Sequence, residues 1–367
     1  MKIEETILNN FTLCYPIENL CTIDKILFLD IETTGFLSSS SYIYLIGCAY
    51  FEYDNWIIKQ FFAQSKDEEQ QIITEFLNFA SNYEYLIHYN GNTFDLPFIE
   101  KRAGIYSINS TLSSKNGLDI YKRIYTYKNL LKLEDCKLKT IEQYLNIKRD
   151  DRFNGGELIE VYKEYTSSHD YDLYRTLMLH NLDDMKGMLE VLPILSYYDI
   201  FNEQLLATKV LYNSYKDMDG FNKQELIINV KLPCSIPNPI SFMGQGCHFK
   251  AENDNASLMV PIYEEELKYF YANYKDYYYL PLEDNALHKS IASFVDKDYR
   301  EPAKASNCYT RKISKFLPMW TVLKQPFFKR NYESNDLFFE LTDDIKKDRV
   351  LFSEYASHVI NKIAFQK

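Results

Sequence analysis

The sequence predicts an α/β domain with a mixed sheet flanked by helices, followed by a second domain of the α+β class. Three observations support this prediction. The chain has 367 residues, which favours two domains over one. Strand-like runs come first and then alternate with helical patterns, as in α/β proteins. The composition changes near residue 198, and a segment punctuated by prolines, LPCSIPNPI (232–240), follows that change.

The first domain is expected over 24–198, after a short N-terminal lead-in at 1–23. Its strands are expected in runs rich in Ile, Tyr and Phe and bounded by turn residues, at 25–32, 42–51, 55–63, 83–90 and 117–120. The first three runs are joined by short links, which favours antiparallel neighbours. Apolar residues at helical spacing predict helices over 66–83, from within 91–102, and over 120–196 with a Gly-Gly break at 155–156.

The second domain is expected over 199–367, and its type cannot be identified from the sequence. Strand-like runs occupy 205–260 and 334–341, and an amphipathic helix is expected over 343–363. A role in holding a substrate is a hypothesis for this domain.

The composition is that of a globular chain without targeting signals. The net charge of −11 argues against a surface coated in nucleic acid, although a local basic patch can still bind it. Seven cysteines without a CxxC pair predict reduced thiols and a cytoplasmic location. The N-terminus lacks the pattern of a signal peptide. The sequence has no apolar run of about 18 residues, so we expect no membrane span. The sequence contains no GxxxxGK[ST] loop, so we expect no nucleotide cofactor.

Two carboxylates close the first strand-like run, in LFLDIETTGF (27–36). Asp30 and Glu32 are two residues apart, so on a strand they project from the same face. Neighbouring carboxylates repel each other unless a cation lies between them, and Mg²⁺ or Mn²⁺ prefers oxygen ligands. The alternative is that both acids belong to a solvated strand end.

Two later segments contain further acids that could reach the same place. Asp95 follows the strand expected at 83–90 and begins a helix. Asp184 lies in a helical segment four residues after His180, so both share one helix face. Asp183 is a rival of Asp184, because it also lies near the face of His180.

These segments together resemble a DEDD-type 3′–5′ exonuclease of the ribonuclease-H-like superfamily. The resemblance is to a bacterial ribonuclease-H-like family that is similar to the proofreading domains of DNA polymerases. It covers about residues 22–196 and depends on LDIETTG (29–35), HYNGNTFDLPFI (88–99), LDIY (118–121), LKTIEQYLNIKRDD (138–151) and LHNLDDM (179–185).

The resemblance implies two divalent ions, Mg²⁺ or Mn²⁺, about 3.5–4 Å apart in such sites. It implies that the metal ligands are Asp30, Glu32, Asp95 and Asp184. It also implies that Asn90 and Asn92 position the terminal nucleotide and that Phe94 stacks beside it. The alternative for Phe94 is a core aromatic.

His180 departs from the family pattern. One DEDD branch has Tyr four residues before the last Asp, and the other has His five residues before it. Here His180 stands four residues before Asp184. Histidine ordinarily titrates near neutral pH, with a pKa of about 6.5, so His180 is a candidate base for the attacking water. A hydrogen-bonding or structural His180 stays open.

Basic residues supply candidate phosphate contacts. Lys101 and Arg102 follow the second motif and either meet a phosphate or are solvated. Residues 289–330 contain ten Lys or Arg against three Asp or Glu, a local charge of +7, interleaved with aromatic residues. Cations for phosphates and rings for bases are typical of a single-strand-binding surface, here with Lys304, Arg311 and Lys312. The alternative is a solvated basic stretch.

The sequence therefore predicts a metal-dependent 3′–5′ exonuclease that hydrolyses phosphodiester bonds of DNA or RNA by a two-metal mechanism. Its partner would be a nucleic-acid single strand or 3′ end. Two alternatives stay open: a structure-selective endonuclease on the same core, and a catalytically dormant nucleic-acid-binding protein. The sequence chooses neither the sugar nor the oligomeric state.

Overall fold

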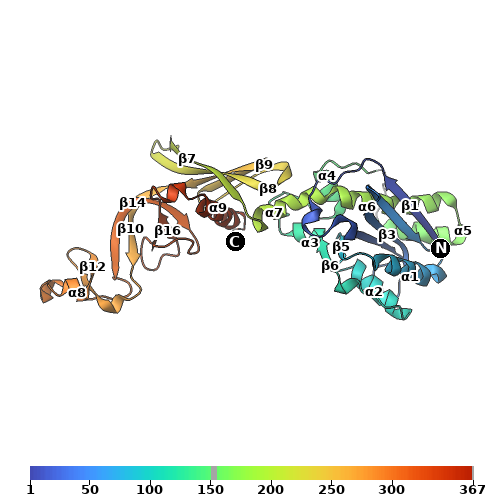
Figure 1. Ribbon diagram of the computed structural model, residues 1–367, viewed down its shortest axis with the longest axis horizontal. Coiled ribbons are helices and arrows are strands. Elements are labelled where there is room, and N and C mark those ends of the chain that lie inside the picture. Colours follow the sequence, from blue (N-terminus) through green and yellow to red (C-terminus); the bar gives the residue numbers. More distant parts are fainter. Residues whose placement is uncertain (150–154, 366–367) are drawn as a thin grey trace. The chain divides into compact units, whose positions relative to one another are not determined.

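A computed structural model describes residues 1–149 and 155–365 of the chain (Figure 1). Asp150 and Asp151, at the end of the matching segment 138–151, lie outside the described residues. Contacts divide the chain into two compact units, Met1–Tyr198 and Asp199–Lys367. No helix among the described residues is long and apolar enough to cross a membrane.

The first unit is built on one mixed sheet of six strands, in the order β1-β4-β3-β2-β5-β6. The strands are β1 (Lys2–Leu8), β2 (Ile26–Thr33), β3 (Ile43–Glu52), β4 (Asn55–Phe62), β5 (Tyr85–His88) and β6 (Asn116–Asp119). β2, β3 and β4 are antiparallel neighbours, as their short links predict, whereas β5 and β6 run parallel to β2. The expected mixed α/β sheet is confirmed.

The segment expected to be a lead-in, residues 1–23, contains β1. This strand pairs antiparallel with β4 along its whole length and forms one edge of the sheet. Its sequence, KIEETIL, lacks a clear apolar alternation, and Ile3 and Ile7 are exposed. An edge strand has a single neighbour and tolerates polar residues, so periodicity alone did not reveal it.

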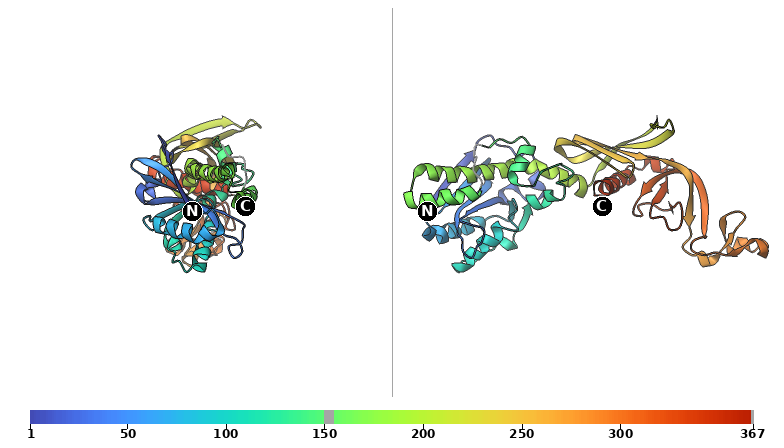
Figure 2. Two further views of the ribbon diagram at one scale, coloured as in Figure 1. Left: turned by 90° about the vertical axis from the view of Figure 1, so that its right-hand side faces the viewer. Right: turned by 180° about the vertical axis from the view of Figure 1, so that it is seen from behind.

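Helices cover both faces of this sheet (Figure 2). α1 (Glu69–Ala80) and α2 (Asp95–Ile105) pack on one face, around a core that includes Leu29 and Phe76. α5 (Gly155–Ser168) and α6 (Tyr171–Glu190) pack on the other, around Tyr44 and Tyr162. The long helical pattern from 120 onward also contains α3 (Ile120–Tyr125), α4 (Leu138–Tyr144) and the start of α7 (Ser196–Asn202).

The alternation of β2 decides which side chains meet which helices. Leu29 and Ile31 belong to the core under α1 and α2. Asp30 and Glu32 therefore project from the opposite face, toward α6. α6 begins at its N-cap Asp170, whose Oδ1 accepts the backbone N–H of Asp172 at 2.7 Å.

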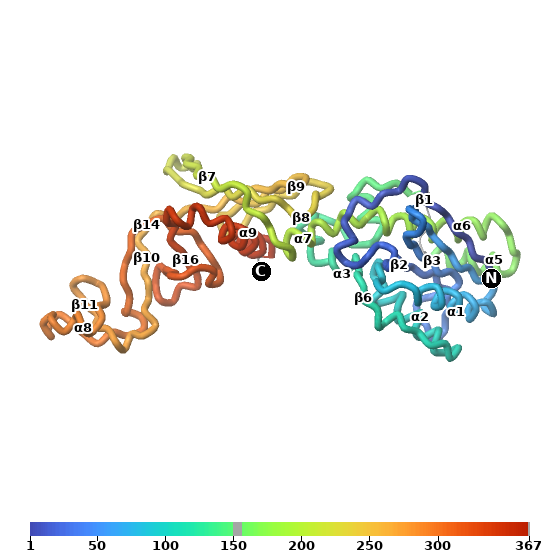
Figure 3. The backbone as a smooth tube through the Cα atoms, in the orientation of Figure 1, coloured from blue at the N-terminus to red at the C-terminus, as the bar shows by residue number. Residues whose placement is uncertain are grey.

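The second unit is mainly β-structure, and Figure 3 traces the path of its backbone. A three-stranded antiparallel sheet consists of β7 (Leu206–Lys216), β8 (Asn222–Gly244) and β9 (Cys247–Pro261). The C-terminal helix α9 (Arg349–Ala364) packs against these strands. A second sheet contains β10 (Tyr263–Phe270), β14 (Tyr309–Met319), β16 (Leu337–Glu340) and β15 (Phe327–Phe328).

A small third sheet stands between β10 and β14 in the sequence. It consists of β11 (Tyr277–Leu280), β12 (Asn285–His288) and β13 (Glu301–Pro302), with the short helix α8 (Lys289–Ala292) after β12. The strands expected within 205–260 and 334–341 and the final helix are present. β10 to β15 were not expected, because charged residues and Tyr hide the period of two in these segments.

Candidate active site

Two carboxylates lie side by side on β2, a central strand with β3 and β5 on either side. Asp30 and Glu32 point to the face that α6 covers, because a strand returns to the same face every second residue. Glu32 is only 8% exposed, and Asp30 is partly buried. The pair therefore lies where water screens their mutual repulsion poorly.

Asp95 joins these acids from the first position of α2. Its Oδ1 accepts the backbone N–H of Ile31 at 3.1 Å, which places it beside β2. The loop before α2 is held by Asp119, whose carboxylate accepts the N–H groups of Asn90 at 3.0 Å and Asn92 at 3.2 Å. Asn90 has a φ of 63°, in the left-handed region that asparagine tolerates. This turn, held by Asp119, places Asp95 next to β2.

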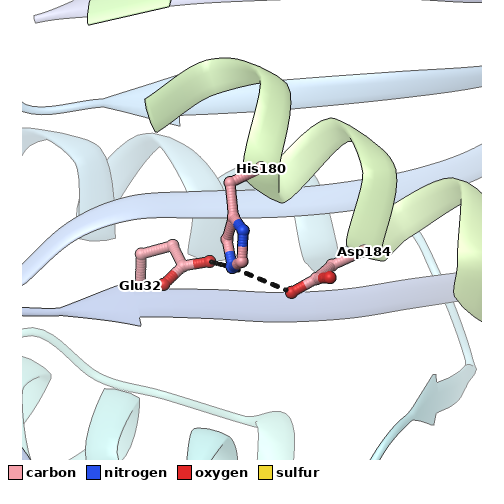
Figure 4. Close-up of side chains that lie close together, drawn as sticks. All are labelled: Glu32, His180 and Asp184. Carbon is pink, nitrogen blue, oxygen red and sulfur yellow. Dashed lines mark ion pairs between the residues drawn. The ribbon is translucent and has the colours of Figure 1, made fainter. Parts of the chain in front are cut away.

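α6 contributes His180 and Asp184, which share one helix face. Nε2 of His180 lies 3.5 Å from Oε1 of Glu32 and 3.4 Å from Oδ2 of Asp184. Figure 4 shows these three side chains facing one another across the gap between β2 and α6. One potential ligand atom from each lies within 4.8 Å of the others, and Asp183 is not part of this group.

The electrostatics agree with a cluster of acids. Burial raises the pKa of Asp30 well above its ordinary value, and the charges of Asp95, Asp184 and Glu32 raise it further. A hydrogen bond from Nδ2 of Asn181, at 3.0 Å from Oδ2 of Asp30, opposes this shift of the Asp30 pKa. The Asp30 carboxylate is therefore close enough to the other three for their charges to disfavour its ionisation.

Asp95 is affected mainly by its surroundings. Burial raises the pKa of Asp95 to about 7, although the hydrogen bond from Ile31 acts in the opposite direction. The charge of Asp119 raises the pKa of Asp95 further. A buried carboxyl group that ionises only near neutral pH is a common feature of functional sites.

The donor set suits a divalent cation. It offers oxygen atoms from carboxylates on β2, α2 and α6, all buried or partly buried, with the nitrogen of one histidine beside them. Hard cations such as Mg²⁺ and Mn²⁺ prefer oxygen ligands, and they would remove the repulsion that raises the pKa of Asp30. The residues present therefore fit the metal that the sequence predicts.

Arg149, which the sequence does not identify as a site residue, lies against Asp184. One terminal nitrogen of its guanidinium donates to both carboxylate oxygens of Glu142, at 3.0 and 3.2 Å, and the other donates to Oδ1 of Asp184. Gly187 leaves room for this arrangement, because a Cβ atom there would lie 1.9 Å from Oε1 of Glu142. Arg149 belongs to the matching segment 138–151, but only the fold shows which acids it meets.

The residues expected near the terminal nucleotide lie in the loop after β5 and at the N-cap of α2, the helix that begins with Asp95. Asn92 is exposed, Asn90 is partly buried, and Phe94 is partly buried against the core under α2. The ring of Phe36, which is 80% exposed, lies 6.5 Å from the ring of Phe94 in an edge-to-face arrangement. Phe36 ends the LFLDIETTGF stretch, and an aromatic residue directly after the TTG turn was the signal in the sequence.

The adjacent side chains of Lys101 and Arg102 have different surroundings in the structure. Lys101 is exposed, whereas Arg102 is buried and forms an ion pair with Glu69. Nε of Arg102 donates to Oε1 of Glu69 at 2.8 Å, and the same oxygen accepts the backbone N–H of Ile43 at 2.8 Å. Both sequence expectations for Arg102, a phosphate contact and a solvated side chain, are therefore wrong. The helix period places it toward α1, not toward water.

The basic stretch of the second unit is partly neutralised by acids. Lys304, Arg311 and Lys312 are all exposed. Nζ of Lys312 lies 2.7 Å from Oε2 of Glu340, and a terminal nitrogen of Arg311 lies 3.4 Å from Oε1 of Glu266. These acids come from β16 and β10, the two neighbours of β14, so the local charge seen in the sequence overstates the charge in space.

One family model matches the chain. It is described as the RNase_H superfamily and covers residues 27–195. A comparison with curated protein sequences gives no significant match.

Solved structures with some similarity include a family B DNA polymerase from the hyperthermophilic archaeon Pyrobaculum calidifontis. It has 12% identity and a TM-score of 0.35, and the alignment covers 68% of this chain and 35% of that chain. Another is the zinc-ion-bound form of an E. coli ExoI–ssDNA complex, with 11% identity, a TM-score of 0.28, and coverage of 57% of this chain and 55% of that chain. The alignments cover less than two thirds of the polymerase chain and of the ExoI chain. TM-scores this low support no argument about function.

Proposed function

Residues 27–195 have the ribonuclease-H-like fold, and from this premise we propose that the protein is a divalent-metal-dependent nuclease that removes nucleotides from 3′ ends. The observation that supports the proposal most is the convergence of four carboxylates and one histidine from β2, α2 and α6. Their order along the chain is that of a DEDD-type 3′–5′ exonuclease, which favours cleavage from an end over internal cleavage.

The ions would be held by the carboxylates of Asp30, Glu32, Asp95 and Asp184. When bound, two divalent ions supply a nucleophile at neutral pH and stabilise the charge of the scissile phosphate. The protein contributes the placement of the carboxylates. β2 fixes two of them on one face, the Ile31 N–H orients Asp95, and Arg149 holds one oxygen of Asp184.

His180 is proposed to accept the proton of the attacking water. Its Nε2 faces both Glu32 and Asp184, so it lies where the water would be activated. Its distance of four residues from Asp184 puts it on the same helix face without a change in helix geometry. The same position makes direct metal ligation the competing role.

The substrate would enter past the loop between β5 and α2. Asn90 and Asn92 present amide groups there, and Phe36 and Phe94 form an aromatic edge on which a terminal base can stack. Lys304, Arg311 and Lys312 of the second unit are proposed to hold the phosphate backbone of a longer strand. Lys304 is the best candidate of the three, because Arg311 and Lys312 already have acidic partners.

The decisive experiment uses 5′-labelled single-stranded DNA and RNA with Mn²⁺ or Mg²⁺. We expect a ladder that shortens from the 3′ end and that disappears with a chelator or in Asp30→Asn. Asp172→Asn, an exposed acid in the first turn of the same helix α6, is the matched control and should retain activity.

A substrate with a blocked 3′ end separates the remaining possibilities. Cleavage of the blocked strand would replace the exonuclease proposal by an endonuclease on the same core. Tight binding of both strands without metal-dependent cleavage would show a dormant nucleic-acid-binding protein and would refute the proposed activity.

A further inference from the structure

Asn181 is the residue next to the proposed base, and its side chain is completely buried between α6 and the sheet. Its Nδ2 donates to Oδ2 of Asp30 at 3.0 Å, and its Oδ1 accepts from Nε2 of Gln60 at 3.0 Å. Gln60 lies on β4 and is itself only 2% exposed. One amide therefore links an expected metal ligand to a strand that carries no site residue.

The strands are aligned for this link. Asp30 on β2 pairs in register with Gly47 on β3, and Gly47 pairs in register with Gln60 on β4. Residues paired across neighbouring strands project to the same face. Asp30, Gly47 and Gln60 thus form one row across three strands, and the middle residue is a glycine without a side chain. The amide of Asn181, from α6, occupies the space above Gly47.

Gly47 is necessary for this fit. A Cβ atom at Gly47 would lie 2.2 Å from Oδ1 of Asn181 and 2.8 Å from its Nδ2. No side chain adopts such contacts, so any larger residue would push the amide away from its position. The space that a side chain at position 47 would occupy is therefore filled by the amide of Asn181.

The direction of the amide follows from the network. Nε2 of Gln60 also donates to the backbone carbonyl of Met178 at 2.9 Å. A carbonyl only accepts, so the nitrogen of Gln60 must face Met178 and Asn181. Asn181 must then present its oxygen to Gln60 and its nitrogen to Asp30. Asp30 is therefore offered a hydrogen-bond donor, which holds one carboxylate oxygen and leaves the other for a cation.

We propose that Asn181 is a positioning residue that sets the orientation of the Asp30 carboxylate for metal binding, and that a glycine is required at position 47 for the Asn181 amide to fit. The proposal rests on the proposed function of the site. It differs from a purely structural role, in which the same amide would only attach α6 to the sheet. Partners that orient the ligands of a metal typically change metal affinity about 10- to 100-fold when they are removed.

The test measures Mn²⁺ binding to the metal-free protein by titration calorimetry, together with thermal unfolding. Asn181→Ala is expected to weaken Mn²⁺ binding about 10- to 100-fold. Gly47→Ala, which keeps the amide but displaces it, is expected to weaken binding comparably. The double variant should be no worse than Asn181→Ala alone, because the added methyl group then occupies the space of the lost amide. Gly104→Ala on α2, where a Cβ atom would meet nothing within 4 Å, is the matched control.

Catalysis gives a second readout that a structural role would not move. In both single variants we expect a higher Mn²⁺ concentration for half-maximal rate and an unchanged KM for the oligonucleotide. Mn²⁺ affinity equal to that of wild type in folded Asn181→Ala, or additive losses in the double variant, would overturn the proposal. Absence of Mn²⁺ binding by the wild-type protein would overturn the proposed function, and the positioning role with it.

Discussion

His180 is the residue whose role depends most on short distances. Its Nε2 is nearly equidistant from Glu32 Oε1, at 3.5 Å, and Asp184 Oδ2, at 3.4 Å. A base and a metal ligand would both occupy such a position. The two roles differ in what happens to metal affinity when the imidazole is removed, because a base contributes to the rate and a ligand contributes to binding.

His180→Gln is expected to lower kcat by roughly 10²- to 10⁴-fold, the usual contribution of a general base. Glutamine retains hydrogen bonding but accepts no proton near neutral pH. Steady-state kinetics with Mn²⁺ titration checks this, and the Mn²⁺ concentration for half-maximal rate should stay constant. A parallel loss of rate and Mn²⁺ affinity would identify His180 as a ligand instead.

Asp183 and Asp184 are adjacent in sequence but differ in their surroundings. Only Asp184 belongs to the group with Glu32 and His180, and Asp183 is buried elsewhere on α6. We expect Asp184→Asn to abolish metal-dependent cleavage and Asp183→Asn to retain it, in the 3′-end assay. The reverse result would reassign the last acid of the motif to Asp183.

At the scale of elements, α6 and β2 carry most of the candidate site and α2 carries the remaining acid. α6 presents His180, Asn181 and Asp184 to the same face of the sheet within two turns. α2 is held from behind by the ion pair of Arg102 with Glu69, which also accepts the Tyr106 hydroxyl at 2.6 Å. The position of α2 relative to the sheet therefore depends on a buried charge network.

Arg102→Met is expected to lower the free energy of unfolding by about 3–5 kcal/mol, because it leaves the Glu69 carboxylate buried without its cation. Chemical denaturation measures this loss. The neighbouring variant Lys101→Met removes an exposed charge and should change stability by less than about 0.5 kcal/mol. Equal and small effects of the two variants on stability would contradict a stabilising role for the ion pair of Arg102 with Glu69.

At the scale of the whole molecule, the acidic cluster links stability to pH and, under the proposed function, to metal. Asp95 has a pKa of about 7 in the folded protein, above the ordinary value of an unfolded aspartate. Its stabilising contribution is fully present below the unfolded pKa and is lost as the pH rises through about 7. The raised pKa of Asp30 acts in the same direction. A divalent ion would need the ionised carboxylates, so we expect it to bind best where the metal-free protein is least stable.

Thermal unfolding with chelator and with Mn²⁺ should show this coupling. We expect the increase in Tm caused by Mn²⁺ to be larger at about pH 8 than at about pH 5.5, because protons compete with the metal. Asp95→Asn, which cannot ionise, should reduce both the Mn²⁺ effect and its pH dependence. An equal increase in Tm at both pH values would contradict a site formed by these carboxylates.

The second unit offers its own comparison of two lysines. Lys304 is exposed, whereas Lys312 is neutralised by Glu340. Lys304→Gln is expected to weaken oligonucleotide binding and to reduce the salt dependence of log Kd by about one unit. Lys312→Gln should have a smaller effect. Fluorescence anisotropy over a range of salt concentrations measures both, and an unchanged affinity for Lys304→Gln would remove this residue from the substrate path.

The sequence by itself determined the features that depend on neighbours in the chain. Runs of apolar and aromatic residues bounded by turn residues predicted β2 to β6, and the period of two along a strand placed Asp30 and Glu32 on one face. Helical spacing placed His180 with Asp184. Motif order predicted the fold of the first unit, and the matched family model agrees with it.

Tertiary structure alone decided everything that depends on register and packing between distant segments. The pairing of β1 with β4, the burial of Arg102 against Glu69, and the acidic partners of Arg311 and Lys312 all join residues far apart in the chain. The row of Asp30, Gly47 and Gln60 exists only once three strands are in register and α6 lies on them. Local periodicity reports which face a residue occupies, whereas only the folded packing reports what it meets there.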